Sequence, residues 1–375
     1  MCMSAFNKKW LINGSALFLL FGINRAFAEY AYNFPESVSP LTKNIYDVHM
    51  MTTKLAFWIM VIIIAVVGFA IFKFRKSSGY EADQEFHKGT FGTWSWLLVP
   101  VVVLGIDFGI SGPGLKALDM VEKNIDADLT VKVIGSQWKW TYEYVSDDVQ
   151  IISNLLPEEK AGDKYLREVD NPLVLPTDRK VRFLHTATDV LHAWWVPSIA
   201  IKKDSIPGYI NETWTQIEKE GTYYGQCAEN CGRGHAYMPI RVEAVSPEKF
   251  DAWMAEQKKQ KLAALAEAQS DKDWSLEELM AKGEKTYNTY CVACHQATGL
   301  GVPGVFPALK GSAVAIGPMD AHLAIVMNGK AGTAMSGWSA QLNDLDLAAV
   351  ITYERNAWGN DSGDLIQPKE IKAAR

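Results

Sequence analysis

The chain has 375 residues, of which 48% are apolar and 21% are charged. This composition excludes an intrinsically disordered protein, and the length indicates two or three domains. The formal net charge of −6 argues against a nucleic-acid partner.

The N-terminal segment has the order of an export signal. Lys8 and Lys9 precede a short apolar run, and Ala26-Phe27-Ala28 forms an A-x-A cleavage site. We therefore expect residues 1–28 to be a signal peptide and the mature chain to begin at Glu29. Retention of the signal as a third membrane helix is the alternative.

Two apolar stretches follow, at about 55–74 and 93–112. Each is long enough to cross a hydrocarbon core of about 30 Å, which predicts a two-helix transmembrane hairpin within residues 29–120. Lysine and arginine in the short loop between them place that loop in the cytoplasm and both outer ends on the other side. Asp107 lies inside the second stretch, where an ionisable residue is either functional or paired at the membrane interface.

Three further segments differ in composition. In 121–246, short runs rich in β-branched and aromatic residues alternate with Pro, Gly and Asp, which predicts the strands of a β-sandwich or barrel. Residues 247–274 are rich in Ala, Lys, Gln and Glu, and we expect a helical linker there. The last segment, 275–375, combines helical patterns with Gly-rich loops, which indicates a small all-α domain.

The segment 227–238 places two thiols, an imidazole and a thioether within twelve residues, and a second imidazole lies 35 residues upstream. These donors suit copper. Two sulfurs can bridge two metal ions, each of which then takes one imidazole, while the methionine and a backbone carbonyl complete the set. Such a pair shares one electron, so little rearrangement accompanies electron transfer. A disulfide, structural zinc and a methionine that only fills the core are the alternatives. The predicted copper ligands are His192, Cys227, Cys231, His235 and Met238.

Cys291-Val292-Ala293-Cys294-His295 is the C-x-x-C-H signature of covalent haem attachment. Two thioethers would hold the porphyrin, and the histidine is placed to bind the iron. Met319, Met327 and Met335 lie downstream as candidates for the sixth ligand. A chance match or a redox dithiol is the alternative.

The hairpin and the copper segment resemble subunit II of the cytochrome c oxidases, whose motif C-x-E-x-C-x-x-x-H-x-x-M is matched at every ligand position. The resemblance implies a cupredoxin-like β-barrel with a dinuclear copper centre, CuA. It implies that the backbone carbonyl of Glu229 is a copper ligand, and that the Glu229 carboxylate reaches a Mg²⁺ at the contact with subunit I. It also places Trp138, within the aromatic segment 135–144, where that family has the tryptophan through which electrons enter.

The last domain resembles class I cytochromes c. There the axial methionine occupies a loop before the final helix, which makes Met335 the predicted sixth ligand, although Ser336 follows where that family often has proline. A methionine ligand raises the haem potential. Gly283 and Tyr287 resemble that family's helix-contact residues.

One position departs from the oxidase pattern. The family has a glutamate before the second membrane span, at the mouth of a proton channel, and this chain has Thr93 there. His87 and Glu85 are candidate replacements. The departure leaves the proton route open and keeps a CuA-containing nitric oxide reductase as the alternative function.

These resemblances together predict a subunit of a caa-type haem-copper oxidase, a proton-translocating enzyme, with its metal domains on the periplasmic side of a bacterial inner membrane. Electrons are expected to pass from cytochrome c or a cytochrome bc complex to the haem, then to CuA. From there we expect them to pass through the Trp138 region to a catalytic subunit that reduces dioxygen to water. Subunits I and III are the expected partners. A periplasmic carrier or copper-delivery protein is a further alternative, against which the membrane hairpin argues.

Overall fold

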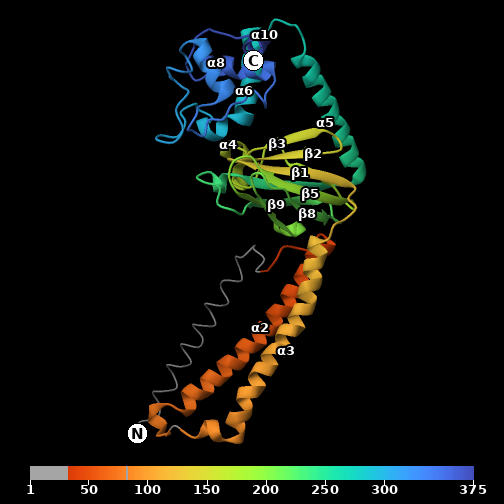
Figure 1. Cartoon of the computed structure of the whole chain (residues 1–375), viewed down its shortest axis with the longest axis vertical. Helices are drawn as coiled ribbons and strands as arrows, with labels where there is room; N and C mark the ends of the chain where they lie inside the picture. Colours follow the sequence, from red (N-terminus) through yellow and green to blue (C-terminus); the bar gives the residue numbers. More distant parts are fainter. Residues whose placement is uncertain (1–32, 82) are drawn as a thin grey trace, which may run out of the picture. The chain divides into compact units, whose positions relative to one another are not determined.

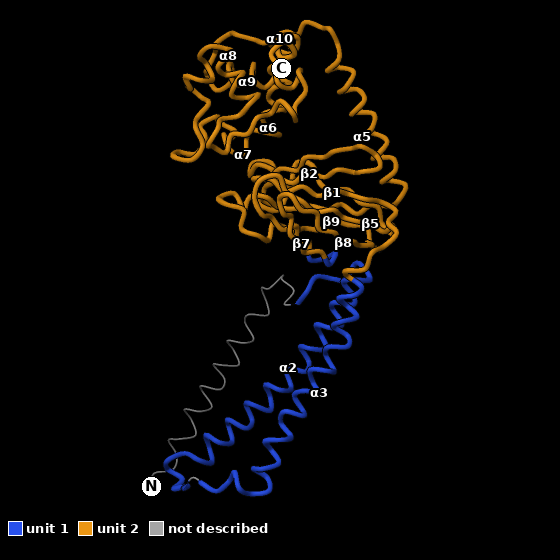
Figure 2. The backbone as a smooth tube through the Cα atoms, in the orientation of Figure 1, with its two compact units in different colours: residues 1–120, 197–200 blue, residues 121–196, 201–375 orange. Residues whose placement is uncertain are grey.

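The computed structural model describes residues 33–81 and 83–375. They divide into two compact units, one of the described residues up to 120 with 197–200 and one of residues 121–196 with 201–375 (Figure 2). The expected signal peptide and its cleavage site lie outside the described residues.

Two long apolar helices form most of the first unit: α2 (Pro40–Lys73) and α3 (Thr90–Glu122). α2 begins with a capping box, in which Ser39 and Thr42 satisfy each other's backbone N–H groups. Both helices are long and apolar enough to cross a membrane. They extend beyond the apolar stretches because helix ends are set by caps and backbone hydrogen bonds, not by the limits of the apolar segment.

The connection between these helices contains two short 3₁₀ turns, η1 (Lys76–Ser78) and η2 (Phe86–Lys88). Gly92, at the start of α3, packs so closely on this connection that a Cβ would lie 2.2 Å from the carbonyl oxygen of Phe86. The beginning of α3 therefore packs closely against η2.

Residues 129–245 fold into two five-stranded sheets, in the orders β3-β2-β1-β5-β8 and β4-β10-β9-β6-β7 (Figure 1). β1 pairs with β5, and β4 with β10, in parallel, whereas the other strand pairs are antiparallel. The strands are β1 (Leu129–Ser136), β2 (Lys139–Tyr144), β3 (Val149–Ser153), β4 (Leu173–Pro176), β5 (Lys180–Ala187), β6 (His192–Val196), β7 (Ile201–Ser205), β8 (Asn211–Gln216), β9 (Gly221–Cys227) and β10 (Pro239–Val245). Short helical turns between them are α4 (Glu158–Ala161), η3 (Gly162–Lys164), η4 (Pro197–Ile199) and η5 (His235–Tyr237).

An aromatic core joins the two sheets. Trp140, Tyr142 and Tyr144 alternate along β2 and are fully buried, as the period of two in a strand requires. From the other sheet, the Trp194 indole donates a hydrogen bond to the Tyr142 hydroxyl over 3.4 Å. The Trp194 ring also lies 5.3 Å from the ring of Phe183. The predicted cupredoxin-like β-domain is confirmed.

The polar segment after the β-domain forms α5 (Pro247–Ala268). Its first turns pack on the β-domain: Phe250 is buried, and the Trp253 ring lies 5.3 Å from that of Tyr144. Arg179 holds Asp251 with two hydrogen bonds of 2.9 Å. The N-terminal part of this helix is therefore fixed to the β-domain rather than free of it.

The C-terminal part is helical, with α6 (Leu276–Tyr290), α7 (Val292–His295), α8 (Met319–Asn328), α9 (Asp344–Asn356) and α10 (Pro368–Ala374). α6 and α9 cross at Gly283, where a Cβ would lie 2.1 Å from the carbonyl oxygen of Ala349. Tyr287, one turn later, is fully buried, and its ring lies 5.5 Å from that of Tyr353 in a tilted arrangement. Gly283 and Tyr287 thus lie at the helix contact that the sequence predicted.

Candidate metal and haem sites

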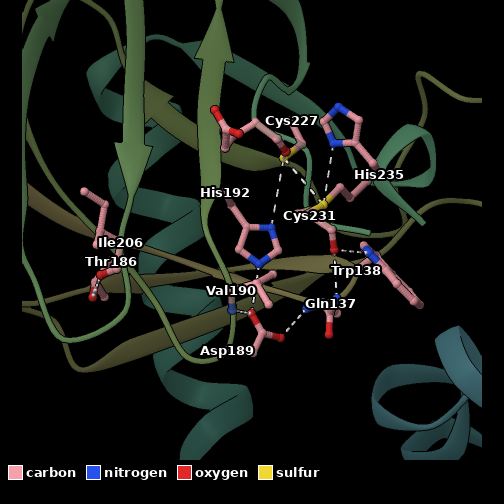
Figure 3. Close-up of polar contacts among 12 residues, drawn as sticks. Gln137, Trp138, Thr186, Asp189, Val190, His192, Ile206, Cys227, Cys231 and His235 are labelled. Carbon is pink, nitrogen blue, oxygen red and sulfur yellow. Dashed lines mark hydrogen bonds and ion pairs between the residues drawn. The ribbon is translucent and has the colours of Figure 1, made fainter. Parts of the chain in front are cut away.

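The two cysteines of the copper motif lie at the end of β9 and in the loop that follows it, next to the start of β6 (Figure 3). Their sulfurs are 3.9 Å apart, far beyond the ~2.05 Å of a disulfide bond. Each sulfur faces one imidazole: Cys227 Sγ lies 4.0 Å from His192 Nδ1, and Cys231 Sγ lies 3.5 Å from His235 Nδ1. This geometry contradicts the disulfide alternative.

Each thiol also lies beside one further group that can bind a metal ion weakly. The Met238 thioether lies 3.4 Å from Cys231 Sγ, and the backbone carbonyl of Glu229 lies 3.3 Å from Cys227 Sγ. Met238 is only 1% exposed. One zinc ion takes four ligands, whereas here two sulfurs, two imidazoles, a thioether and a carbonyl converge. These soft sulfur and imidazole donors would suit copper, which would accept and release an electron there.

The two thiols influence each other's ionisation. The hydrogen bond with Cys231 lowers the pKa of the Cys227 thiol, and the same interaction raises the pKa of Cys231. The imidazole of His192 further favours the Cys227 thiolate. A thiolate, which is the form that binds metal, is therefore most easily formed at Cys227.

Asp189 orients the first imidazole. Its carboxylate accepts a hydrogen bond from His192 Nε2 over 2.9 Å and another from the backbone N–H of Gln137 over 2.7 Å (Figure 3). Burial disfavours its charged form, yet these hydrogen bonds lower the pKa of Asp189 below its ordinary value. The bond to Nε2 leaves His192 Nδ1 directed at Cys227. Sequence reasoning assigned Asp189 no role, because only the fold shows which nitrogen it holds.

Two glycines make room for the site. A Cβ on Gly135 would lie 2.8 Å from ring carbons of His192, and one on Gly234 would lie 2.2 Å from the Trp138 ring. Sequence reasoning missed both positions, because the clash comes from residues distant in the chain. Trp138, held in this way, donates its indole N–H to the Cys231 carbonyl over 3.1 Å.

The other side of Trp138 contacts the C-terminal helical domain (residues 275–375), which contains the C-x-x-C-H motif and is called the haem domain below. Its ring centroid lies 5.9 Å from that of Phe306, in an edge-to-face arrangement. Trp138 therefore lies on the haem side of the copper ligands. The direction in which electrons pass through the Trp138 region stays a prediction.

The haem-attachment residues directly follow α6: Cys291 caps its C-terminal end, and Cys294 and His295 lie in the single turn of α7. Cys291 and Cys294 are free thiols. His295 is 9% exposed, and its Nδ1 lies 3.0 Å from the Pro307 carbonyl, which can accept a hydrogen bond from the Nδ1–H group. This hydrogen bond leaves Nε2 with the lone pair that a haem iron requires. The residues therefore fit a covalently attached haem.

The three candidate methionines have different surroundings. Met327 is 5% exposed and belongs to the core of the haem domain, and Met319 packs against that core. Met335 is half-buried in the loop before α9, where its backbone carbonyl accepts a hydrogen bond from Lys330 N–H over 2.9 Å. Met335 alone of the three lies in a loop rather than on α8, so it remains the predicted sixth ligand.

The remaining predicted residues lie at surfaces. The Thr93 hydroxyl donates to the backbone carbonyl of His87 over 3.3 Å, and Glu85 forms an ion pair with Lys88. Asp107 is exposed on α3. The Glu229 carboxylate also belongs to an exposed residue. Of Glu229, the backbone carbonyl lies beside the copper ligands, 3.3 Å from Cys227 Sγ.

Two protein-family models match the chain. "Cytochrome C oxidase subunit II, periplasmic domain" matches residues 129–245, and "Cytochrome C oxidase, cbb3-type, subunit III" matches residues 278–353. The probable cytochrome c oxidase subunit 2 of Rickettsia bellii (strain RML369-C) is 36% identical over 257 residues, which are 68% of this chain and 93% of the relative. Cytochrome c oxidase subunit 2 of Mycosarcoma maydis is 35% identical, over 64% of this chain and 98% of the relative.

Among solved structures, the periplasmic domain of subunit II of cytochrome oxidase of Bradyrhizobium japonicum is 39% identical, with a TM-score of 0.34. The match covers 36% of this chain and 97% of that one. The two relatives above extend the likeness over about two thirds of the chain, including the copper motif. We conclude that the chain belongs to the cytochrome c oxidase subunit 2 family and, with a cytochrome c domain fused at its C-terminal end, is the subunit through which electrons enter the oxidase.

Proposed function

We propose that this chain relays single electrons from a donor to the catalytic subunit of the oxidase through two sites of its own. When bound, CuA and haem c each accept and release one electron at a time. The proposed division of the chain is a signal peptide (1–28), a membrane hairpin (29–120), a copper domain (121–246), a helical linker (247–274) and a haem domain (275–375). The proposed CuA ligands are His192, Cys227, the Glu229 carbonyl, Cys231, His235 and Met238, and the proposed haem c residues are Cys291, Cys294, His295 and Met335.

One observation carries the copper assignment: two free sulfurs 3.9 Å apart, each faced by its own imidazole nitrogen. The surrounding residues hold this arrangement in place. Asp189 fixes the ring of His192, while Gln137 and Trp138 both donate to the carbonyl of Cys231, over 2.8 and 3.1 Å. A ligand set fixed in this way moves little when its charge changes, which favours fast electron transfer.

The finer assignments concern partners and location. Oxidase subunits I and III are the proposed partners, and a cytochrome c or a cytochrome bc complex is the proposed donor. The exposed carboxylate of Glu229 is available for a Mg²⁺ at the contact with subunit I. The family model for residues 129–245 is that of a periplasmic domain, which supports the outer face of a bacterial inner membrane for both metal domains.

The test is gas consumption by the complex purified through a tag on this chain and supplied with reduced cytochrome c. We expect rapid dioxygen uptake that cyanide inhibits, together with the optical band of covalent haem and the electron paramagnetic resonance signal of a dinuclear copper. Slow dioxygen uptake with rapid nitric oxide uptake would instead place the catalytic partner among the nitric oxide reductases. Absence of either metal signal would refute the corresponding site.

A further inference from the structure

A lysine of the copper domain is buried against the haem domain. Lys139, the first residue of β2, is only 9% exposed. Its Nζ donates to the Thr289 carbonyl over 3.2 Å and lies 4.7 Å from the ring centroid of Tyr290 and 5.5 Å from that of Trp338. All three contacts come from the haem domain. A carbonyl and two aromatic faces are what a buried cation needs to offset its lost hydration.

The position of these contacts in the haem domain is informative. Thr289 and Tyr290 directly precede Cys291, and Trp338 follows Met335 by three residues. The two chain segments proposed to hold the haem therefore meet at the Lys139 ammonium. The copper domain contacts the haem domain at the face where the cofactor would be held.

The neighbouring residue extends this contact into a continuous path. The Trp138 indole donates to the Cys231 carbonyl over 3.1 Å, and its ring lies 5.9 Å from that of Phe306. Phe306 is bonded directly to Pro307, whose carbonyl lies 3.0 Å from Nδ1 of His295. A proposed copper ligand and the proposed haem-iron ligand are thus linked by two hydrogen bonds and one ring contact.

We propose that Lys139 is a positioning residue that pins the chain's own haem domain onto the copper domain, with Phe306 and Pro307 completing the link between His295 and Trp138. This inference rests on the proposed function. The step that it serves moves one electron, which oxidises the haem iron and reduces the copper pair, and no bond forms or breaks. Phe306 of the haem domain contacts the partly exposed Trp138 ring, and we therefore expect a soluble donor to reduce the haem first.

The docking is tested first by chemical labelling of the whole oxidase complex. Lysines are acetylated briefly and the extent at each position is read by mass spectrometry. Lys202 is the matched reference, because its ammonium lies 5.1 Å from the Trp195 ring within the copper domain but is exposed. We expect Lys139 to be protected and Lys202 to react. Substituting Tyr290→Ala together with Trp338→Ala should make Lys139 reactive. Equal labelling of Lys139 and Lys202 in the native complex would overturn the proposal.

The positioning role is tested by the rate of electron transfer from haem to copper after rapid reduction of the haem by light. Lys139→Met should slow it by about tenfold or more, because small displacements of reacting partners are costly. Lys139→Arg should restore most of the rate, since a guanidinium also stacks on aromatic rings. Lys202→Met is the control, and its rate should equal that of the native complex.

Two results would overturn this role: a native rate in Lys139→Met, or a rate in Lys139→Arg as slow as in Lys139→Met. The optical and paramagnetic signals of both metals are recorded in each variant, and they should be unchanged. If the native complex lacks either metal signal, the proposed function fails. The labelling experiment still decides whether the domains dock through Lys139, because it requires no electron transfer.

Discussion

Met327 and Met335 of the haem domain have different surroundings, and this difference favours one of them as the sixth haem ligand. Met327 is buried in the core, whereas Met335 is half-buried in a loop. We predict that Met335→Leu keeps the covalent haem but lowers its reduction potential, because the thioether ligand is lost. Met327→Leu conserves side-chain volume and should leave the potential near native. The measurement is a spectroscopic redox titration, and the opposite pattern would assign the ligand to Met327.

The carboxylate of Asp189 acts on the copper site by orienting the imidazole of His192. Asp189 holds His192 through Nε2 and directs Nδ1 to the copper site. We predict that Asp189→Asn weakens copper binding by about 10- to 100-fold, because the ring is no longer fixed by a carboxylate. Asp204→Asn, an exposed position on β7, is the control. Competition with a copper chelator measures the affinity, and equal affinities in both variants would show that Asp189 has no such role.

At the scale of elements, the close crossing of α6 and α9 depends on Gly283, which has no side chain. Alanine normally stabilises a helix relative to glycine by about 0.5–1 kcal/mol. At Gly283, however, the new Cβ would lie 2.1 Å from a carbonyl oxygen of α9. We predict that Gly283→Ala lowers the stability of the haem domain by about 1–3 kcal/mol, since the helices must separate.

The measurement for Gly283→Ala is thermal unfolding followed by haem absorbance. Lys285→Ala, at an exposed position of the same helix, is the control and should be neutral or slightly stabilising. A rise in the unfolding temperature of Gly283→Ala would contradict the prediction, because it would show that the contact between α6 and α9 tolerates a Cβ at this position.

For the whole molecule, a buried imidazole in the β-domain links its folding to pH. His185 is fully buried, hydrogen-bonded to the Thr213 hydroxyl over 2.7 Å, and burial lowers its pKa to about 3. The unfolded chain, with a pKa of about 6.5 there, binds an extra proton between about pH 6.5 and pH 3. The stability contribution is complete above pH 6.5 and is lost as the pH falls, by up to about 1.4 kcal/mol per pH unit.

We predict that His185→Gln, which keeps a hydrogen-bonding group toward Thr213, flattens the pH dependence of unfolding between pH 7 and pH 5. Urea denaturation followed by tryptophan fluorescence measures the free energy at each pH. His87→Gln, at an exposed position of the first unit, should leave the slope as it is in the native chain. Parallel profiles for the native chain and His185→Gln would show that another group sets the acid sensitivity.

The sequence by itself determined the features that local chemistry specifies. Apolar length predicts the two membrane helices, because the bilayer sets how many residues a span requires. Short runs of β-branched and aromatic residues between turn residues predict the strands of the β-domain. The metal and haem motifs are recognisable because their donors lie within one loop or one turn, and the identities of Cys227, Cys231 and the C-x-x-C-H residues are sufficient to suggest the chemistry.

Only the tertiary structure decided the contacts between residues distant in the chain. It brought His192 next to the Cys227 loop, placed Asp189 on one ring nitrogen and showed that Gly135 must lack a side chain. It also placed the Trp138 ring against that of Phe306, a residue 168 positions later in the chain. Composition and periodicity carry no information on such pairs, because they depend on how strands and helices pack and not on which residues adjoin along the chain.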